Sequence, residues 1–179
     1  DMGALVTAAH RDRVAGLVEA GLSEGADLVI DGRGFGVEGH DDGFWLGPCL
    51  FDNVTAEMEI YQQEIFGPVL CVVRVASYAE GLAFINANSY GNGTAIFTGD
   101  GAAARDFQRN VTVGMVGINV PIPVPVAFHS FGGWKDSLFG SNHIYGPEGI
   151  RFNTAYKAIR SRWPERADSQ VSLVFPDGG

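Results

Sequence analysis

The sequence is poor in cysteine and in basic residues, and it has no long apolar run. Its two cysteines, Cys49 and Cys71, could form at most one disulfide, and neither stands at a metal-ligand spacing from the four histidines. No apolar segment approaches the ~20 residues of a membrane helix, and the first residues, DMGALVTAAHRDR, lack a signal-peptide pattern. We therefore expect a soluble, intracellular protein in a reducing compartment, with no metal site.

The charge balance excludes further classes of partner. Twelve Lys and Arg stand against 21 Asp and Glu, which gives a formal net charge of −9. Such a charge repels phosphate backbones and anionic lipid surfaces. We expect no nucleic-acid partner and no membrane partner, and a small molecule or a protein is favoured instead.

Helical and extended patterns alternate along the 179 residues. Thr7 can cap a helix over about residues 8–24 that Gly25 can close, and two more helices are predicted at 77–88 and 100–110. Short β-branched or aromatic runs predict strands within five segments: 26–34, 44–51, 68–75, 93–99 and 113–120. The alternation is typical of βαβ units and predicts an α/β fold with an open, largely parallel sheet flanked by helices.

The pattern changes after Gly149. Residues 150–163 have partly alternating apolar side chains, and the segment VSLVF at 171–175 is a short apolar strand behind a polar connector. An unpaired strand of this kind exposes backbone donors and apolar side chains, so we expect it to pair with another chain. The predicted organisation is a domain over 1–150 and a tail over 151–179 with oligomerisation strands.

No residue of the chain is a convincing catalytic nucleophile. Cys71 lies among aliphatic residues in PVLCVVRV, where burial raises the pKa of a thiol, and Cys49 lies in a similar apolar run. No histidine has a context that indicates a Cys/His pair, and His10 is expected on a solvated helix face. The segment GRGFGVEG at 32–39 lacks the spacing of a phosphate-binding loop.

The stretch from 117 to 140 differs in kind from the rest of the chain. Its prolines prevent regular secondary structure, and its aromatic residues crowd into a glycine-rich loop after a strand. Such loops line ligand clefts in α/β folds, and the alternative is that the aromatic rings cover the core. The residues concerned are Pro121, Pro123, Pro125, Phe128, Phe131, Trp134 and Phe139.

Four segments together resemble the aldehyde dehydrogenase superfamily. They are EIFGPVL at 64–70, INVPIPVPVAF at 118–128, FGGWKDSLFG at 131–140 and the opening MGALVTAAHRDRV. Within the superfamily, INVPIPVP is similar to the CoA-acylating methylmalonate-semialdehyde dehydrogenases. One departure is that Ser141 follows Gly140 where this subfamily usually has Asp.

The resemblance implies roles for individual residues. Glu64 would accept hydrogen bonds from the hydroxyls of the nicotinamide ribose, and Phe66 would pack near the nicotinamide ring. The chemistry agrees, because a carboxylate can accept from a vicinal diol and an aromatic face suits a flat ring. Phe131 would line the aldehyde tunnel, and its mouth would be formed by Pro121, Ile122, Pro123 and Val124.

The resemblance also implies a function for the chain. It is similar to the C-terminal part of an enzyme that oxidises (methyl)malonate semialdehyde with NAD and passes the acyl group to coenzyme A, in valine or inositol catabolism. The family's nucleophilic cysteine, catalytic glutamate, oxyanion-hole asparagine and dinucleotide-binding domain have no counterpart here, so the chain alone is expected to be inactive. It is then a fragment of a longer enzyme or the product of a truncated gene.

Further expectations concern assembly and compartment. The family implies a homo-oligomer, a dimer or a tetramer, in the cytoplasm, or in the mitochondrial matrix if the source is a eukaryote. The competing interpretation is a non-catalytic interaction module that pairs through its C-terminal strand without turning over a substrate.

Overall fold

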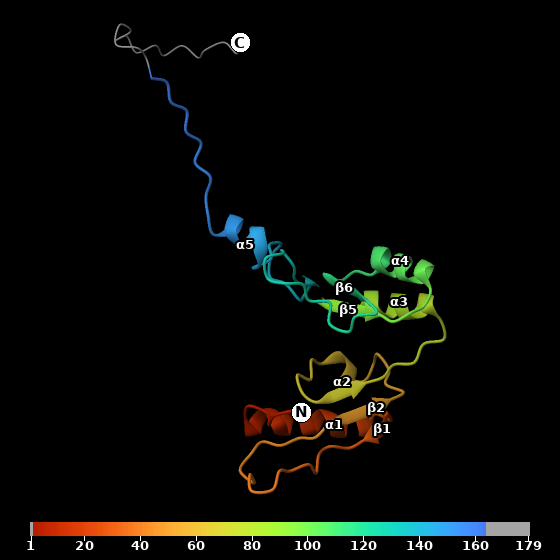
Figure 1. Ribbon diagram of the computed structural model, residues 1–179. Helices are drawn as coiled ribbons and strands as arrows, with labels where there is room; N and C mark the ends of the chain where they lie inside the picture. Colours follow the sequence, from red (N-terminus) through yellow and green to blue (C-terminus); the bar gives the residue numbers. More distant parts are fainter. Residues whose placement is uncertain (1, 164–179) are drawn as a thin grey trace. The chain divides into compact units, whose positions relative to one another are not determined.

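The computed structural model describes residues 2–163, which fall into two compact units. Among these residues the first unit ends at Phe84 and the second begins at Ile85, and Figure 1 shows the elements of both. Within residues 2–163, no helix is long and apolar enough to cross a membrane.

Helix α1, Ala8–Ser23, opens the first unit and has the predicted ends. The Thr7 hydroxyl accepts a hydrogen bond from the backbone N–H three residues later, at 3.1 Å, which satisfies one of the free donors of the first turn. After the helix, Gly25 adopts φ +98°, a left-handed conformation that costs glycine nothing. The predicted helix is confirmed, and its buried face comprises Val14, Leu17, Val18 and Gly21.

The sheet of the first unit has three strands in the order β1-β2-β3. They are β1 (Asp27–Ile30), β2 (Cys49–Asp52) and β3 (Val69–Cys71). β2 and β3 are parallel, and the short helix α2 (Glu59–Gln62) lies in the crossover between them. β1 and β2 are antiparallel, and the connection 31–48 contains no helix.

The core of the first unit forms where α1 and α2 meet the sheet (Figure 1). Phe51 of β2 and Val18 of α1 are fully buried, and Ile60 of α2 is 2% exposed. The helices approach closely because position 21 is glycine: a Cβ there would lie 2.8 Å from two carbon atoms of the Ile60 side chain.

Helix α3, Tyr78–Ala87, begins in the first unit and ends in the second. Its N-terminus is capped as predicted: the Glu80 N–H donates to the Ser77 hydroxyl at 3.2 Å, and the Glu80 carboxylate accepts from the Ala76 N–H at 2.7 Å.

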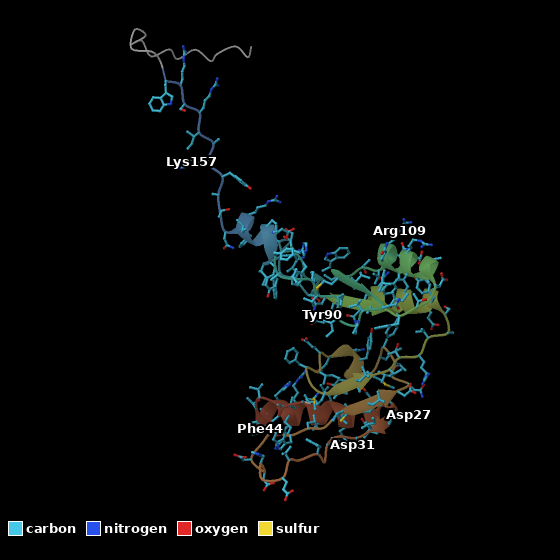
Figure 2. All side chains as sticks on the ribbon, in the orientation of Figure 1. Asp27, Asp31, Phe44, Tyr90, Arg109 and Lys157 are labelled. Carbon is cyan, nitrogen blue, oxygen red and sulfur yellow. The ribbon has the colours of Figure 1, made fainter. Side chains whose placement is uncertain are left out.

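The second unit contains two small sheets. β5 (Gly93–Ile96) and β6 (Met115–Ile118) are parallel, with helix α4 (Gly101–Asn110) in the crossover between them. β4 (Tyr90–Gly91) and β7 (Trp134–Lys135) are antiparallel. The helix α5, Gly146–Phe152, follows. Figure 2 labels Tyr90 on β4 and Arg109 in the last turn of α4.

The observed architecture agrees with the prediction only at the level of class. The fold is mixed α/β, but the described residues form one three-stranded sheet and two two-stranded sheets in place of the predicted open, largely parallel sheet. The predicted boundary at 150 stays a prediction, and the predicted strand at 171–175 lies outside the described residues.

Replacing Phe51 by alanine should strongly destabilise the first unit. A fully buried phenylalanine loses its transfer free energy and leaves a cavity, so the free energy of unfolding should fall by about 3–5 kcal/mol. Chemical denaturation followed by circular dichroism measures the change. The matched control is Phe139→Ala, because Phe139 is 101% exposed. Equal effects of the two substitutions would contradict the described core.

Candidate functional site

The turn from Glu64 to Gly67 lies between α2 and β3. The Glu64 side chain is exposed, and Phe66 is 79% exposed. Phe66 also has φ +53°, a left-handed conformation that is uncommon for a residue with a Cβ. The turn therefore presents a carboxylate and an aromatic ring to the surroundings from a constrained backbone.

Two side chains of α1 bind the backbone of this turn. The Arg13 guanidinium donates from Nη2 to the Glu64 carbonyl at 2.8 Å and from Nη1 to the Ile65 carbonyl at 3.0 Å. His10 Nε2 lies 2.8 Å from the Phe66 carbonyl, and because a carbonyl only accepts, this nitrogen carries the proton. Three successive carbonyls of the turn are thus bonded to one helix.

The expectation that His10 sits on a solvated helix face is wrong. The side chain is half-buried, and its ring is bonded to the turn. Sequence reasoning also missed Arg13. The spacing of three residues between His10 and Arg13 places both side chains on one face of α1, and this spacing could have indicated a shared contact.

Gly67 brings the turn against the same helix. A Cβ at this position would lie 2.9 Å from both γ-carbons of Val14, which is fully buried on α1. A larger residue would push the turn away from the helix that holds it. The glycine of the E-x-F-G-P motif is therefore required here by close packing.

The proline-rich loop lies in the second unit, directly after β6. Pro123 packs over the paired strands: its Cγ would lie 3.5 Å from a Cβ at Gly93, and its Cβ would lie 3.4 Å from one at Gly117. Its neighbours are exposed, Ile122 by 72% and Val124 by 53%. Pro121 is exposed as well. The loop therefore anchors one proline and presents an apolar surface.

Phe131 stacks on Tyr145 in the same unit. The ring centroids are 4.8 Å apart and the planes differ by 3°. A glycine is needed beside Phe131, because a Cβ at Gly132 would lie 2.6 Å from Cδ2 of His143. His143 is held in turn by Glu148, whose carboxylate accepts from the His143 backbone N–H at 2.8 Å and lies 3.3 Å from the ring Nδ1.

The lysine of the F-G-G-W-K motif has a structural contact. Lys135 Nζ donates to the carbonyls of Asn86 and Asn88 at the end of α3, both at 2.9 Å. A cation at this place satisfies free carbonyls and is favoured by the helix dipole. The motif thus ties β7 to α3, while Ser141 farther along is exposed.

The predicted site residues form two groups. Glu64 and Phe66 belong to the first unit, and Phe131 and the segment 121–124 belong to the second. Within each group, the side chains stand on a backbone fixed by the contacts just described.

Both cysteines belong to the hydrophobic interior of the first unit. Cys49 is 2% exposed, and its Sγ accepts from the Gly32 N–H at 3.3 Å. Cys71 packs against the same core, and desolvation raises the pKa of its thiol. Neither environment activates a thiolate. Among residues 2–163, no three His, Cys, Asp or Glu side chains are grouped as a metal site would need.

A pocket of about 330 Å³, which the sequence did not predict, lies between α1 and the glycine-rich loop 32–47. Arg33 at its edge donates to the carboxylates of Asp31, labelled in Figure 2, and Glu19. The hydrogen bonds from Arg33 lower the pKa of Asp31 to about 2. Because carboxylates already neutralise this arginine, the cluster serves to brace the loop against α1.

Comparisons with known proteins agree with these motifs. The model of the aldehyde dehydrogenase family matches residues 1–159. A malonate-semialdehyde dehydrogenase of Pseudomonas aeruginosa is 61% identical over 177 residues, which cover 98% of this chain and 36% of that protein. The chain thus spans about a third of the length of the relatives it matches.

Solved structures give the same result. The crystal structure of a methylmalonate-semialdehyde dehydrogenase from Oceanimonas doudoroffii matches with a TM-score of 0.88 and 53% identity, over 93% of this chain and 34% of that one. A Mycobacterium tuberculosis aldehyde dehydrogenase complexed with NAD⁺ matches with a TM-score of 0.74 and 33% identity, over 85% of this chain and 30% of that one. With motifs, family model and structural neighbours in agreement, the chain belongs to the aldehyde dehydrogenase family.

Proposed function

We propose that this chain is a segment of an NAD-dependent (methyl)malonate-semialdehyde dehydrogenase, in which it supplies a clamp for the cofactor and part of the aldehyde tunnel. The observation that carries the proposal is the turn Glu64–Gly67, which exposes a carboxylate and an aromatic ring on a backbone held by α1. The NAD-bound structure of a relative supports the choice of cofactor.

The residues present fit the nicotinamide half of NAD. The exposed Glu64 carboxylate has two acceptor oxygens for the two hydroxyls of a ribose. Phe66 offers most of its ring to a flat partner, and Gly67 keeps the turn close to α1. When bound, NAD accepts the hydride that leaves the substrate carbon, and the chain's part is to hold the ribose and limit where the ring can lie.

The second unit supplies surface for the substrate. Ile122 and Val124 present apolar side chains from the proline-rich loop, and the Phe131–Tyr145 stack fixes an aromatic wall. Together with Pro121 and Pro123, these residues suit the mouth and lining of a tunnel for a small semialdehyde. Coenzyme A as the acyl acceptor rests on the INVPIPVP resemblance.

The nucleophile must come from elsewhere in such an enzyme. Acyl transfer to coenzyme A would require a cysteine that carries the acyl group as a thioester, whereas Cys49 lies in the core and Cys71 packs against it. The comparisons give the share of each relative's length that this chain matches. Its place in the C-terminal part of the enzyme therefore stays a prediction that rests on the motifs.

A second role, in subunit contacts, is favoured by the exposed residues after α5. This part of the chain is rich in large side chains that are uncovered, and surfaces of this kind mark contacts with other protein. They are Tyr156 at 90%, Ile159 at 80% and Trp163 at 89%. We propose that this segment packs on another part of the whole enzyme or on a second subunit, in a dimer or a tetramer. This role also fits the alternative of a non-catalytic interaction module.

Replacing Glu64 by glutamine should weaken cofactor binding. The test uses the Pseudomonas aeruginosa relative with its matching 177 residues replaced by this chain's segment. Glutamine keeps the shape but removes the charge, so the free energy of NAD binding should fall by about 1–3 kcal/mol, measured by titration calorimetry. The matched control is Glu38→Gln, at an exposed position outside the turn. An unchanged NAD dissociation constant in the Glu64 variant would count against the clamp.

The 179-residue chain by itself should not oxidise malonate semialdehyde. Cys49 is buried in the core, where a substrate cannot reach it, and desolvation raises the pKa of Cys71, so neither residue is placed to act as the nucleophile. The absorbance of reduced nicotinamide, followed against a sample without protein and against the chimaeric enzyme, measures the activity. Accumulation of reduced NAD that Cys71→Ala or Cys49→Ala abolishes would overturn the assignment of both cysteines to the core.

A further inference from the structure

We propose that Arg13 and His10 are positioning residues for the cofactor clamp: from α1, they set the backbone geometry of Glu64, Ile65 and Phe66. The inference rests on the proposed function, and it adds residues outside the E-x-F-G-P motif to the cofactor site. Their contacts are with carbonyls of the turn, so they act through the turn and not as ligands themselves.

Within the described residues, the backbone hydrogen bonds on either side of the turn do not reach the carbonyls of residues 64–66. On one side, the last bond of α2 is from the Gln63 N–H to the Glu59 carbonyl. On the other side, the first bond to the sheet is from the Cys49 N–H to the Pro68 carbonyl at 2.8 Å. The carbonyls of residues 64–66 lie between these bonds, and side chains of α1 bind all three.

The backbone at Phe66 needs support from its surroundings. Phe66 has φ +53°, and a residue with a Cβ held in the left-handed region persists only where its surroundings determine it. The bond from His10 Nε2 is made to the carbonyl of this same residue. Without it, we expect the turn to exchange with extended conformations that turn the Phe66 ring elsewhere.

The shape of the Arg13 side chain suits the carbonyls that it binds. The planar guanidinium of Arg13 reaches two successive carbonyls from its two terminal nitrogens, at 2.8 and 3.0 Å. A lysine ammonium is a compact charge on a flexible stem and cannot reproduce a rigid fork. Position 13 therefore requires arginine, whereas a role in surface charge alone would be filled equally well by lysine.

The test begins on the 179-residue chain, by hydrogen–deuterium exchange of peptides covering residues 62–70. Arg13→Ala and His10→Ala should speed exchange in these peptides, Arg13→Lys should restore protection only in part, and His10→Gln, which keeps a donor, should restore most of it. The matched control is Arg11→Ala on the same helix, because Arg11 pairs with Asp12 and does not contact the turn. Exchange at the unsubstituted rate in both alanine variants would overturn the inference.

The functional arm uses the chimaeric enzyme. Arg13→Ala should raise the KM for NAD about tenfold while the KM for the aldehyde changes less than about twofold, because the loss falls on cofactor binding. Arg11→Ala should leave both constants unchanged. If Glu64→Gln weakens NAD binding but Arg13→Ala does not, the positioning role is wrong and the clamp stands. If Glu64→Gln has no effect, the proposed clamp fails, and with it the functional part of the inference.

Discussion

The packing of α1 on the core of the first unit is the constraint on which the geometry of the turn Glu64–Gly67 depends. One face of the helix buries Val18 in the core around Phe51 and Val14 beside Gly67, and the adjoining face directs His10 and Arg13 to the turn. Successive helix residues are rotated by about 100°. If α1 packed on the core one residue out of register, His10 and Arg13 would point away from the carbonyls of the turn. The packing of the core therefore also determines the geometry of the turn in this unit.

The local elements could be predicted because their signals are local. The hydroxyl of Thr7, the left-handed Gly25 and the Ser77–Glu80 pair mark helix ends through bonds to their own neighbours. The partners of the strands could not be predicted in the same way, because pairing joins segments far apart in the chain. The β1–β2 pair is antiparallel and its connection carries no helix, whereas the alternation of helical and extended patterns in the sequence predicted parallel neighbours.

The site residues show a similar division. Glu64, Phe66 and Phe131 were named from a family resemblance, and the structure supplies physical reasons for the glycines beside them. Arg13 was missed and His10 was wrongly expected on a solvated face, because a polar helix face is usually in contact with solvent and the partners of both side chains are backbone carbonyls far away in the sequence. The loop at 121–124 was predicted to be irregular, but only the structure separates the inward Pro123 from its exposed neighbours.

The choice of donors on α1 has a consequence for the conditions under which the turn keeps its shape. A guanidinium stays charged throughout the range in which proteins fold, and a backbone carbonyl does not titrate. Direct hydrogen bonds of 2.8 to 3.0 Å are also far shorter than the distance over which salt screens charges, about 8 Å at physiological ionic strength. The anchoring of the turn is thereby insulated from changes in ionic strength.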